Sequence, residues 1–407
     1  MQLESWPGSW PQPDPDKRYL LYIHVPFCES LCPFCSFHRV RMNKERAHQY
    51  FTALNRQLHA CKSAGFSFSD VYVGGGTPTV LPEALAGTLE LTRELFNVSG
   101  ISVETNPNHL QPRILDLLQS AGVTRLSVGV QSLDDRLLQE MERFAPYGSS
   151  ANILQHLQVA QGRFATLNVD LIFNFPHQSF SSISRDLRLL TALGVDQISC
   201  YPLMPSDTTH HTMDRQIGHV GFAREREYYE RIRDILMPDY QPGSAWCFSR
   251  KAGAIDEYIV DHDEYLGIGS GAFTYLDGSI YSSTFSINHY LDLAGQGQSA
   301  LTAARKLNRR EQVQYDFLMR LFGMRMDKTA MAAKYGPGWR RCVRRELLLF
   351  RWLGALHESG TEVRLGREGM YYWVLMMREL FIGVNNFRAQ MRGQIRSELE
   401  DYPVKVE

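Results

Sequence analysis

The sequence predicts an α/β fold built on a parallel sheet, followed by a smaller and mostly helical region. From residue 19 to about residue 269, short β-branched or apolar runs alternate with longer helical stretches, which is typical of repeated βα units. Each run ends in a turn rich in Gly, Pro, Asn or polar residues. Across residues 295–310 the chain turns polar and basic, and the helical pattern dominates after this break.

Six runs are predicted as the strands of the sheet. In chain order they are YLLYIHV (19–25), SDVYVGG (69–75), GISVETN (100–106), RLSVGV (125–130), TLNVDLIFNF (166–175) and DQISCYPL (196–203). Helical stretches such as residues 43–65 and 82–96 lie between them. Because parallel α/β folds place their chemistry at the carboxyl ends of the strands, the turns after these runs are the expected site.

Three regions are expected along the chain. Residues 1–18, rich in Pro and Trp, are predicted to form an irregular N-terminal arm, and residues 19–295 the sheet with its helices. Residues 296–407 are expected to form a helical C-terminal domain. Within it, LLLFRWLGALHESGTEVRLGREGMYYW predicts a helix, a short hairpin and another helix, in the manner of a winged helix.

Composition indicates a globular protein and narrows its partners. The 407 residues are 44% hydrophobic and 21% charged with a formal net charge of -1, so no global field attracts nucleic acid, which is not an expected partner. The first residues lack the features of a secretory signal, and no run has the roughly 18 apolar residues that cross a bilayer. A cytoplasmic location is therefore expected. The scattered Cys61, Cys200, Cys247 and Cys342 fit a reducing compartment.

Cys28, Cys32 and Cys35 form a cluster directly after the first strand, in the stretch CESLCPFCSF. Three thiolates can hold three irons of a 4Fe–4S cluster and leave the fourth iron open to an external ligand. The alternative is a zinc loop with a distant fourth ligand, for which His24 or His38 could serve. An electron-transfer ferredoxin is disfavoured, because a fourth cysteine at short spacing is missing.

The spacing C-x3-C-x2-C, with Phe34 just before the third cysteine, resembles the motif of the radical S-adenosylmethionine (SAM) superfamily. The resemblance implies a partial (β/α)6 TIM-type barrel, followed here by the helical region. It also implies that SAM chelates the open iron, that one electron cleaves SAM to a 5′-deoxyadenosyl radical, and that Phe34 packs near the adenine. A flavodoxin or ferredoxin is then the expected reductant.

Polar and glycine-rich turns follow the next strands. Gly74, Gly75, Gly76 and Thr77 begin the turn GGGTP, which resembles the superfamily's site for the SAM amino group, although alone it is also an ordinary tight turn. Glu104, Gln131 and Asp170 fall at the ends of the third, fourth and fifth strands. We expect them to line one pocket; a helix cap or a solvated carboxylate is the alternative for each.

Taken in order, LYIHVPFC, VGGGTP, SVETNP, LSVGVQS and VDLIFNFP resemble one subfamily, across about residues 19–290. This HemN-like subfamily contains oxygen-independent coproporphyrinogen III dehydrogenase, its heme-chaperone relative, the anaerobic heme-degrading methyltransferase and class C radical SAM methyltransferases. Its members hold two SAM molecules side by side. Carried over by position, the expected contacts to the SAM pair are Tyr22, Gly75, Thr77, Glu104, Gln131, Arg143 and Asp170, with Met204 and Phe273 lining the site. A helix-surface arginine is the alternative for Arg143.

Departures from this pattern guide the choice of function. The dehydrogenase carries a further cysteine two residues after the third, where this chain has Phe37, and the usual strand-end Gly-Leu is Asn174-Phe175 here. Residues 266–285 also depart from the turn of chaperones and dehydrogenases. The resemblance therefore favours a methyltransferase acting on an sp2 carbon of a small lipophilic ring, preferably menaquinone. A heme or porphyrin enzyme and a heme chaperone remain the alternatives.

For such a methyltransferase, the radical would take hydrogen from the methyl group of the second SAM, and the resulting methylene radical would add to the substrate. A base that completes the reaction is not identifiable. The candidates are Tyr201, His210, His211 and Tyr275, for which ordinary packing or a solvated loop is the alternative.

A lipophilic quinone has to be reached from the membrane. Residues 370–396 combine an apolar stretch with Arg378, Arg388 and Arg392, and would suit an interfacial helix at the inner face of the cytoplasmic membrane. Alternatively, this helix packs on the barrel with a basic solvated face.

Overall fold

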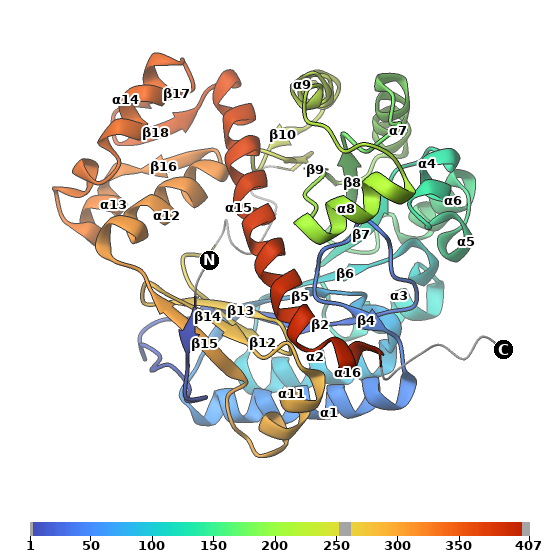
Figure 1. Ribbon diagram of the computed structural model, residues 1–407, viewed down its shortest axis with the longest axis vertical. Coiled ribbons are helices and arrows are strands. Elements are labelled where there is room, and N and C mark those ends of the chain that lie inside the picture. Colours follow the sequence, from blue (N-terminus) through green and yellow to red (C-terminus); the bar gives the residue numbers. More distant parts are fainter. Residues whose placement is uncertain (1–2, 252–261, 401–407) are drawn as a thin grey trace.

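The computed structural model describes residues 3–251 and 262–400, and most of their strands belong to one large mixed sheet (Figure 1). Its parallel centre runs, in order, through β12 (Tyr265–Ile268), β2 (Tyr19–Val25), β5 (Phe68–Gly75), β6 (Gly100–Thr105), β7 (Arg125–Gln131), β8 (Thr166–Phe173) and β9 (Gln197–Pro202). The six runs predicted as strands are confirmed. From β2 to β9 neighbours in the sheet follow chain order, as expected for successive βα units.

Antiparallel strands extend both edges of this centre. Beyond β12 lie β13 (Phe273–Leu276), β14 (Ser279–Ser283), β15 (Leu301–Lys306) and β1 (Glu4–Ser5); beyond β9 lie β11 (Cys247–Ser249) and β10 (Gln241–Pro242). The N-terminal segment thus adds a short strand, and Trp6 packs edge-on against Tyr281 with 5.0 Å between ring centroids. Because β15 belongs to the sheet, we propose a domain boundary after Lys306 rather than at residue 295.

Helices connect and cover the parallel strands. The longer ones are α1 (Lys44–Ser63), α2 (Pro82–Phe96), α3 (Pro112–Ser120), α6 (Ser150–Ala160), α7 (Phe180–Leu193), α9 (Glu225–Leu236) and α11 (Ile287–Gly295). Shorter ones are η1 (Pro78–Val80), η2 (Pro107–His109), α4 (Asp135–Glu140), α5 (Phe144–Tyr147) and α8 (Asp207–Gln216). Local sequence sets their starts; the Asn43 side chain, for example, accepts a hydrogen bond from the Arg46 amide at the start of α1. Every residue of β2 is buried, as expected for a strand covered on both faces.

The C-terminal part is a small helical module with its own three-stranded sheet, ordered β16-β18-β17. Its elements are α12 (Arg309–Phe322), β16 (Arg325–Asp327), α13 (Lys328–Tyr335), η3 (Trp339–Arg341), α14 (Arg344–Trp352), β17 (Leu356–Ser359), β18 (Glu362–Leu365), α15 (Arg367–Gln394) and α16 (Arg396–Glu400). The predicted helix, hairpin and helix correspond to α14, the β17–β18 pair and α15.

The long helix α15 joins this module to the strand-end loops of the sheet (Figure 1). Trp373 and Met377 are fully buried along it, and farther on the Asn385 side chain donates to the Met204 carbonyl at 2.7 Å. The interfacial role expected for residues 370–396 is therefore wrong, because packing inside the protein already covers the apolar face. Nowhere in the described ranges is a helix both long and apolar enough to span a bilayer.

Candidate functional site

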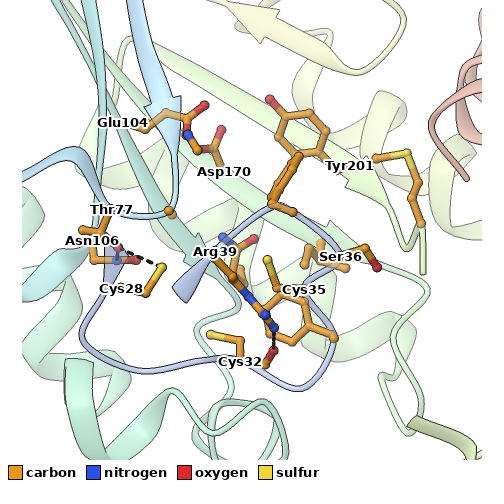
Figure 2. Close-up of a pocket in the computed structure, with 18 of the residues that line it drawn as sticks. Cys28, Cys32, Cys35, Ser36, Arg39, Thr77, Glu104, Asn106, Asp170 and Tyr201 are labelled. Atoms are coloured by element: carbon orange, nitrogen blue, oxygen red, sulfur yellow. Dashed lines mark hydrogen bonds between the residues drawn. The ribbon is translucent and has the colours of Figure 1, made fainter. Parts of the chain in front are cut away.

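Cys28 ends β3 (Phe27–Cys28), and Cys32 and Cys35 lie on the loop that leads from it to β4 (Val40–Arg41); the two short strands pair just after β2. Figure 2 shows Cys28, Cys32 and Cys35 around one open space. All three line the same cavity, which holds about 1550 Å³ that no protein atom fills, part of it open to solvent. The loop therefore presents its thiols to a space large enough for a bound group.

The spacing of these thiols fits a cluster better than a single metal ion. Within residues 3–251 and 262–400, no three His, Cys, Asp or Glu side chains converge as ligands of one ion do. In a 4Fe–4S cluster each cysteine binds a different iron, so its ligands stand apart. Of the two histidines considered as a fourth zinc ligand, His24 uses both ring nitrogens elsewhere and His38 uses one, while the buried Nδ1 of His38 has no hydrogen-bond partner among the described residues. His24 contacts the Tyr22 hydroxyl and the His38 carbonyl, both at 2.9 Å, and the His38 ring contacts the Ser270 hydroxyl at 3.1 Å.

Donors and positive charge surround the cysteines. Arg143 donates to the Cys32 sulfur at 3.4 Å, and the Thr77 hydroxyl donates to the Cys28 sulfur at 3.7 Å. Arg39 donates to the Cys32 carbonyl, while its buried Nε has no hydrogen-bond partner among the described residues. Cationic donors stabilise anionic sulfur, so these contacts suit thiolates bound to iron. Burial raises the pKa of the Cys28 thiol to about 12, so cluster assembly has to displace a proton there.

The glycine turn after β5 is shaped by its two neighbours, the cysteine loop and Glu104. A Cβ on Gly76 would lie 2.6 Å from the Phe27 carbonyl oxygen and 3.0 Å from the Cys28 sulfur, so only glycine allows the turn to approach the cysteine loop this closely. Gly75 has a φ of +119°, and its amide donates to Glu104 at 3.1 Å. The Tyr72 hydroxyl donates to the other Glu104 oxygen at 2.9 Å. The turn thus brings backbone groups beside a fixed carboxylate.

Two partly buried carboxyl groups, Glu104 and Asp170, lie at the strand ends that face the cavity (Figure 2). Asp170 accepts from the Ser127 hydroxyl at 2.8 Å and from the Asn168 amide at 2.7 Å. Burial raises the pKa of both carboxyl groups, that of Asp170 from 3.8 to about 7. Asp170 can therefore exchange a proton with a ligand near neutral pH.

We expect Asp170→Asn to remove a pH dependence of stability in the metal-free protein. Between pH 4 and 7 the folded state keeps a proton on Asp170 that the unfolded state has released, so the wild type loses stability as pH rises through this window. Over about three pH units the free energy of unfolding of the wild type should fall by roughly 4 kcal/mol at most. Urea denaturation at several pH values measures it. Parallel curves for wild type and variant would contradict the assignment.

The departure at Asn174-Phe175 preserves the backbone and changes the packing against the cysteine loop. Asn174 has a φ of +62°, a conformation that asparagine tolerates better than most residues, so it can stand where the family has glycine. Phe175 is buried and packs edge-on against Phe34 of the cysteine loop, with 5.9 Å between ring centroids. The substitution therefore anchors the loop through an aromatic contact.

The structure brings most of the predicted site residues together in this cavity. Those that line it are Tyr22, Cys28, Cys32, Phe34, Cys35, Gly75, Gly76, Thr77, Glu104, Gln131, Arg143, Asp170, Tyr201 and Met204. Their individual contacts with SAM stay predictions.

Other predicted residues do not line the cavity. Gly74 lies behind it, since a Cβ there would overlap the Glu104 carboxyl group at 2.8 Å. Phe273 packs against Phe387 of α15, with 5.8 Å between ring centroids, and approaches the cavity only through its neighbours.

The candidate bases other than Tyr201 are likewise corrected. His210 lies on α8 beside Asp214, with 3.3 Å between Nδ1 and a carboxylate oxygen, and His211 is exposed on the same helix. Tyr275 is buried against Tyr315, with 4.4 Å between ring centroids. Ordinary packing or exposure to solvent accounts for each of these three residues, so this alternative interpretation is better than a role as the base.

Several lining residues were not predicted as part of the site. They include Ser36, Phe37, Arg39, Tyr72, Asn106, Tyr147, Trp246, Phe381, Asn385 and Arg388. Asn106 had a signal, because it follows the third strand directly in SVETNP. Asn385 and Arg388 had none, since they lie far along the chain and reach the cavity only through the packing of α15.

Comparisons with known proteins agree with this geometry. The sequence pattern of the radical SAM superfamily matches residues 22–190. The heme chaperone HemW of Bacillus subtilis is 25% identical over 370 residues, covering 86% of this chain and 95% of the relative. HemW of Mycobacterium tuberculosis (strain ATCC 25618 / H37Rv) is 32% identical over 296 residues, 69% of this chain and 75% of the relative.

Oxygen-independent coproporphyrinogen III oxidase is a second kind of relative. The protein of Salmonella typhimurium is 26% identical over 350 residues, 79% of this chain and 76% of the relative. The solved structure of coproporphyrinogen III oxidase (HemN) from Escherichia coli superimposes with a TM-score of 0.75 at 22% identity, covering 89% of this chain and 90% of that one. This likeness shows that the fold is the same.

These relatives overturn the prediction of a menaquinone methyltransferase, since they are named as a heme chaperone and a porphyrinogen oxidase. The alternative that was left open, a heme or porphyrin protein, agrees better with them. A 4Fe–4S cluster and SAM are the cofactors that this family implies. The chain belongs to the radical SAM superfamily, in the group that contains the heme chaperone HemW and oxygen-independent coproporphyrinogen III oxidase.

Proposed function

We propose that this protein binds heme in the cavity beside its cluster, as a heme-handling member of the radical SAM superfamily. The observation that carries the proposal is the lining of one cavity, which includes the three cysteines, the strand-end carboxyl groups and the aromatic residues Tyr201, Trp246 and Phe381. Apolar walls with a few polar groups suit a second molecule beside SAM. The resemblance to HemW, over 95% of that relative's length, supports heme as the second molecule.

At one end of the cavity, we propose that Cys28, Cys32 and Cys35 hold the cluster, with SAM against the glycine turn and Glu104. When bound, the cluster and SAM supply one-electron cleavage of a SAM carbon–sulfur bond, with the electron coming from a flavodoxin or ferredoxin. The chain's own groups bind and orient: the Gly75 amide and Tyr72 fix the Glu104 carboxylate. In that position Glu104 can accept hydrogen bonds from a ligand's amino or hydroxyl groups.

The other end suits a flat apolar ring that carries acidic groups. Tyr201, Trp246 and Phe381 form an aromatic wall, with ring centroids 5.3 Å apart for Tyr201 and Trp246 and 5.7 Å for Trp246 and Phe381. Met204 and the Tyr201 hydroxyl are groups of the kind that ligate heme iron. Arg388 also lines the cavity and offers a cation to a propionate. Apolar walls with a few polar groups are what a porphyrin requires.

Phe37 favours heme binding over coproporphyrinogen oxidation. It stands where the dehydrogenase pattern has a further cysteine; it lines the cavity, is 45% exposed, and has the Arg388 guanidinium 4.9 Å from its ring centroid. Phenylalanine supplies neither a thiol nor a proton. The residue extends the apolar lining instead, which suits a macrocycle held without oxidation.

Titration of the purified protein with heme under anaerobic conditions tests this proposal. We expect a saturable Soret change at one heme per chain, and no protoporphyrinogen when the protein is incubated with coproporphyrinogen III, SAM and reduced flavodoxin. Failure to saturate, or conversion of coproporphyrinogen, would overturn the proposal. The predicted second SAM would occupy the same end of the cavity, so excess SAM should weaken heme binding if two SAM molecules bind.

A further inference from the structure

Helix α14 lies in the C-terminal module (Figure 1), contributes no residue to the lining of the cavity, and carries an exposed apolar face. Trp352 is 82% exposed, Leu348 56% and Leu349 50%, which makes them the most exposed large hydrophobic side chains in the described ranges. The opposite side is packed, since Leu347 is buried. Leu348 and Trp352 are four residues apart and Leu349 adjoins them, so the three share one helix face.

Arginines extend the same face. Arg344 and Arg345 precede Leu348 and Leu349 by four residues each, and Arg341 lies just before the helix. All three are exposed, and none forms an ion pair within residues 3–251 and 262–400. We call the set Arg341, Arg344, Arg345, Leu348, Leu349 and Trp352 the α14 face.

Nearby acidic groups do not neutralise the α14 face. Glu358 is shared among Lys328, Arg340 and Arg351, and Glu346 accepts a hydrogen bond from Gln314 at 3.1 Å. The whole chain has a net charge of only -1. The positive charge of this surface is therefore local, and an acidic surface would be attracted to this face rather than to the molecule as a whole.

We propose that the α14 face docks on an anionic lipid bilayer. Its apolar side chains project from a convex helix, where they can enter the boundary between headgroups and acyl chains. Tryptophan favours this depth because its ring is amphipathic, and arginines beside it pair with acidic headgroups. Insertion of the apolar side chains and charge complementarity between the arginines and acidic lipids thus account together for the α14 face. The inference does not depend on heme binding.

The docking has a consequence for the cavity. The hairpin that follows α14 leads directly into α15, whose Phe381, Asn385 and Arg388 line the cavity. A protein held at the bilayer by α14 would therefore keep its cavity in a fixed relation to the membrane. A lipophilic ligand could then pass between the two without crossing bulk water.

Co-sedimentation with vesicles tests the proposal. The full-length protein should bind vesicles that contain phosphatidylglycerol and not those of phosphatidylcholine alone, and 0.5 M salt should weaken the binding. Arg344→Glu/Arg345→Glu should reduce partitioning at least about tenfold, since each arginine near the surface accounts for roughly fivefold. Trp352→Ser should reduce it by a similar factor. The matched control is Arg185→Glu/Arg188→Glu, which makes the same charge change on exposed positions of α7 and should bind like the wild type.

If the wild type binds vesicles and both α14 variants bind them equally well, the proposal is overturned. An equal loss of vesicle binding in the α7 control would also overturn it. The face could instead join two copies of the chain. The proposal would therefore also be overturned if the wild type formed a concentration-dependent dimer, did not bind vesicles, and became monomeric on Trp352→Ser. Circular dichroism melting checks that the variants remain folded.

Discussion

Serine in place of Cys32 is expected to leave the protein folded but without an intact 4Fe–4S cluster, and reductive cleavage of SAM should fall by more than about a hundredfold. Serine has nearly the shape of cysteine, so the buried loop keeps its packing. Its hydroxyl does not replace a thiolate on iron, and loss of one of three ligands destabilises the whole cluster. Iron and sulfide content, the visible absorption of the cluster and the yield of 5′-deoxyadenosine measure the effect.

The chain offers a matched control in Cys342, which is only partly buried and lies beside α14, away from the cavity. Cys342→Ser should keep the cluster and the cleavage rate of the wild type. A Cys32→Ser protein that still binds four irons and cleaves SAM would show that Cys32 is not a ligand. Equal loss in both variants would mean that the change acts through folding.

Methionine in place of Arg378 is expected to destabilise the protein by about 3–5 kcal/mol at pH 7. Arg378 of α15 donates to Glu225 of α9 at 2.6 Å, and the Glu225 side chain is fully buried. Without the guanidinium, a carboxylate stays in the interior with the Tyr371 hydroxyl, at 3.4 Å, as its remaining side-chain hydrogen-bond donor among the described residues. Urea denaturation followed by tryptophan fluorescence measures the change.

A pH signature distinguishes this explanation from loss of packing. Burial raises the pKa of Glu225, and removal of Arg378 removes an opposing influence, so the folded variant takes up a proton there as pH falls. The defect should therefore shrink between pH 7 and pH 5. Arg136→Met, which removes an exposed i,i+4 pair with Glu140, is the control and should change stability by about 0.5 kcal/mol or less. A defect of equal size at both pH values would contradict the buried-charge explanation.

Much of the sheet was predictable because its strands carry a local signal. The run at residues 19–25 is apolar or aromatic except for His24, and the structure buries every residue of it. Turn residues after each strand indicated where side chains converge, which is why Glu104, Gln131 and Asp170 were found at the correct edge. The cysteine spacing identified the cofactor class, since ligands on one short loop need no tertiary information.

The remainder depended on how distant segments pack. Asn385 and Arg388 reach the cavity only because α15 leaves the C-terminal module and returns to the strand ends, and no local pattern encodes that path. For the same reason the apolar stretch of α15 resembled an interfacial helix, although Trp373 and Met377 are buried. His210 and His211 were chosen by residue type alone, and α8 directs neither of them into the cavity.

The choice of reaction was wrong for a different reason. Phe37 and Asn174-Phe175 were correctly taken as departures from the dehydrogenase, but absence of one activity does not identify another. The structure gives these residues local roles: Phe175 anchors the cysteine loop through Phe34, and Phe37 packs beside Arg388. Both residues agree with a heme-binding protein as well as they agreed with the methyltransferase, a function that the relatives argue against.

The most direct test of this account is heme titration of three proteins in parallel: the wild type, Phe381→Ser and Trp352→Ser. Phe381 belongs to the aromatic wall of the cavity, whereas Trp352 is an exposed aromatic that could bind heme adventitiously. The account predicts one heme per chain, unchanged in Trp352→Ser and roughly tenfold weaker in Phe381→Ser, with the cluster retained in all three. Binding that is lost in Trp352→Ser and kept in Phe381→Ser would contradict it.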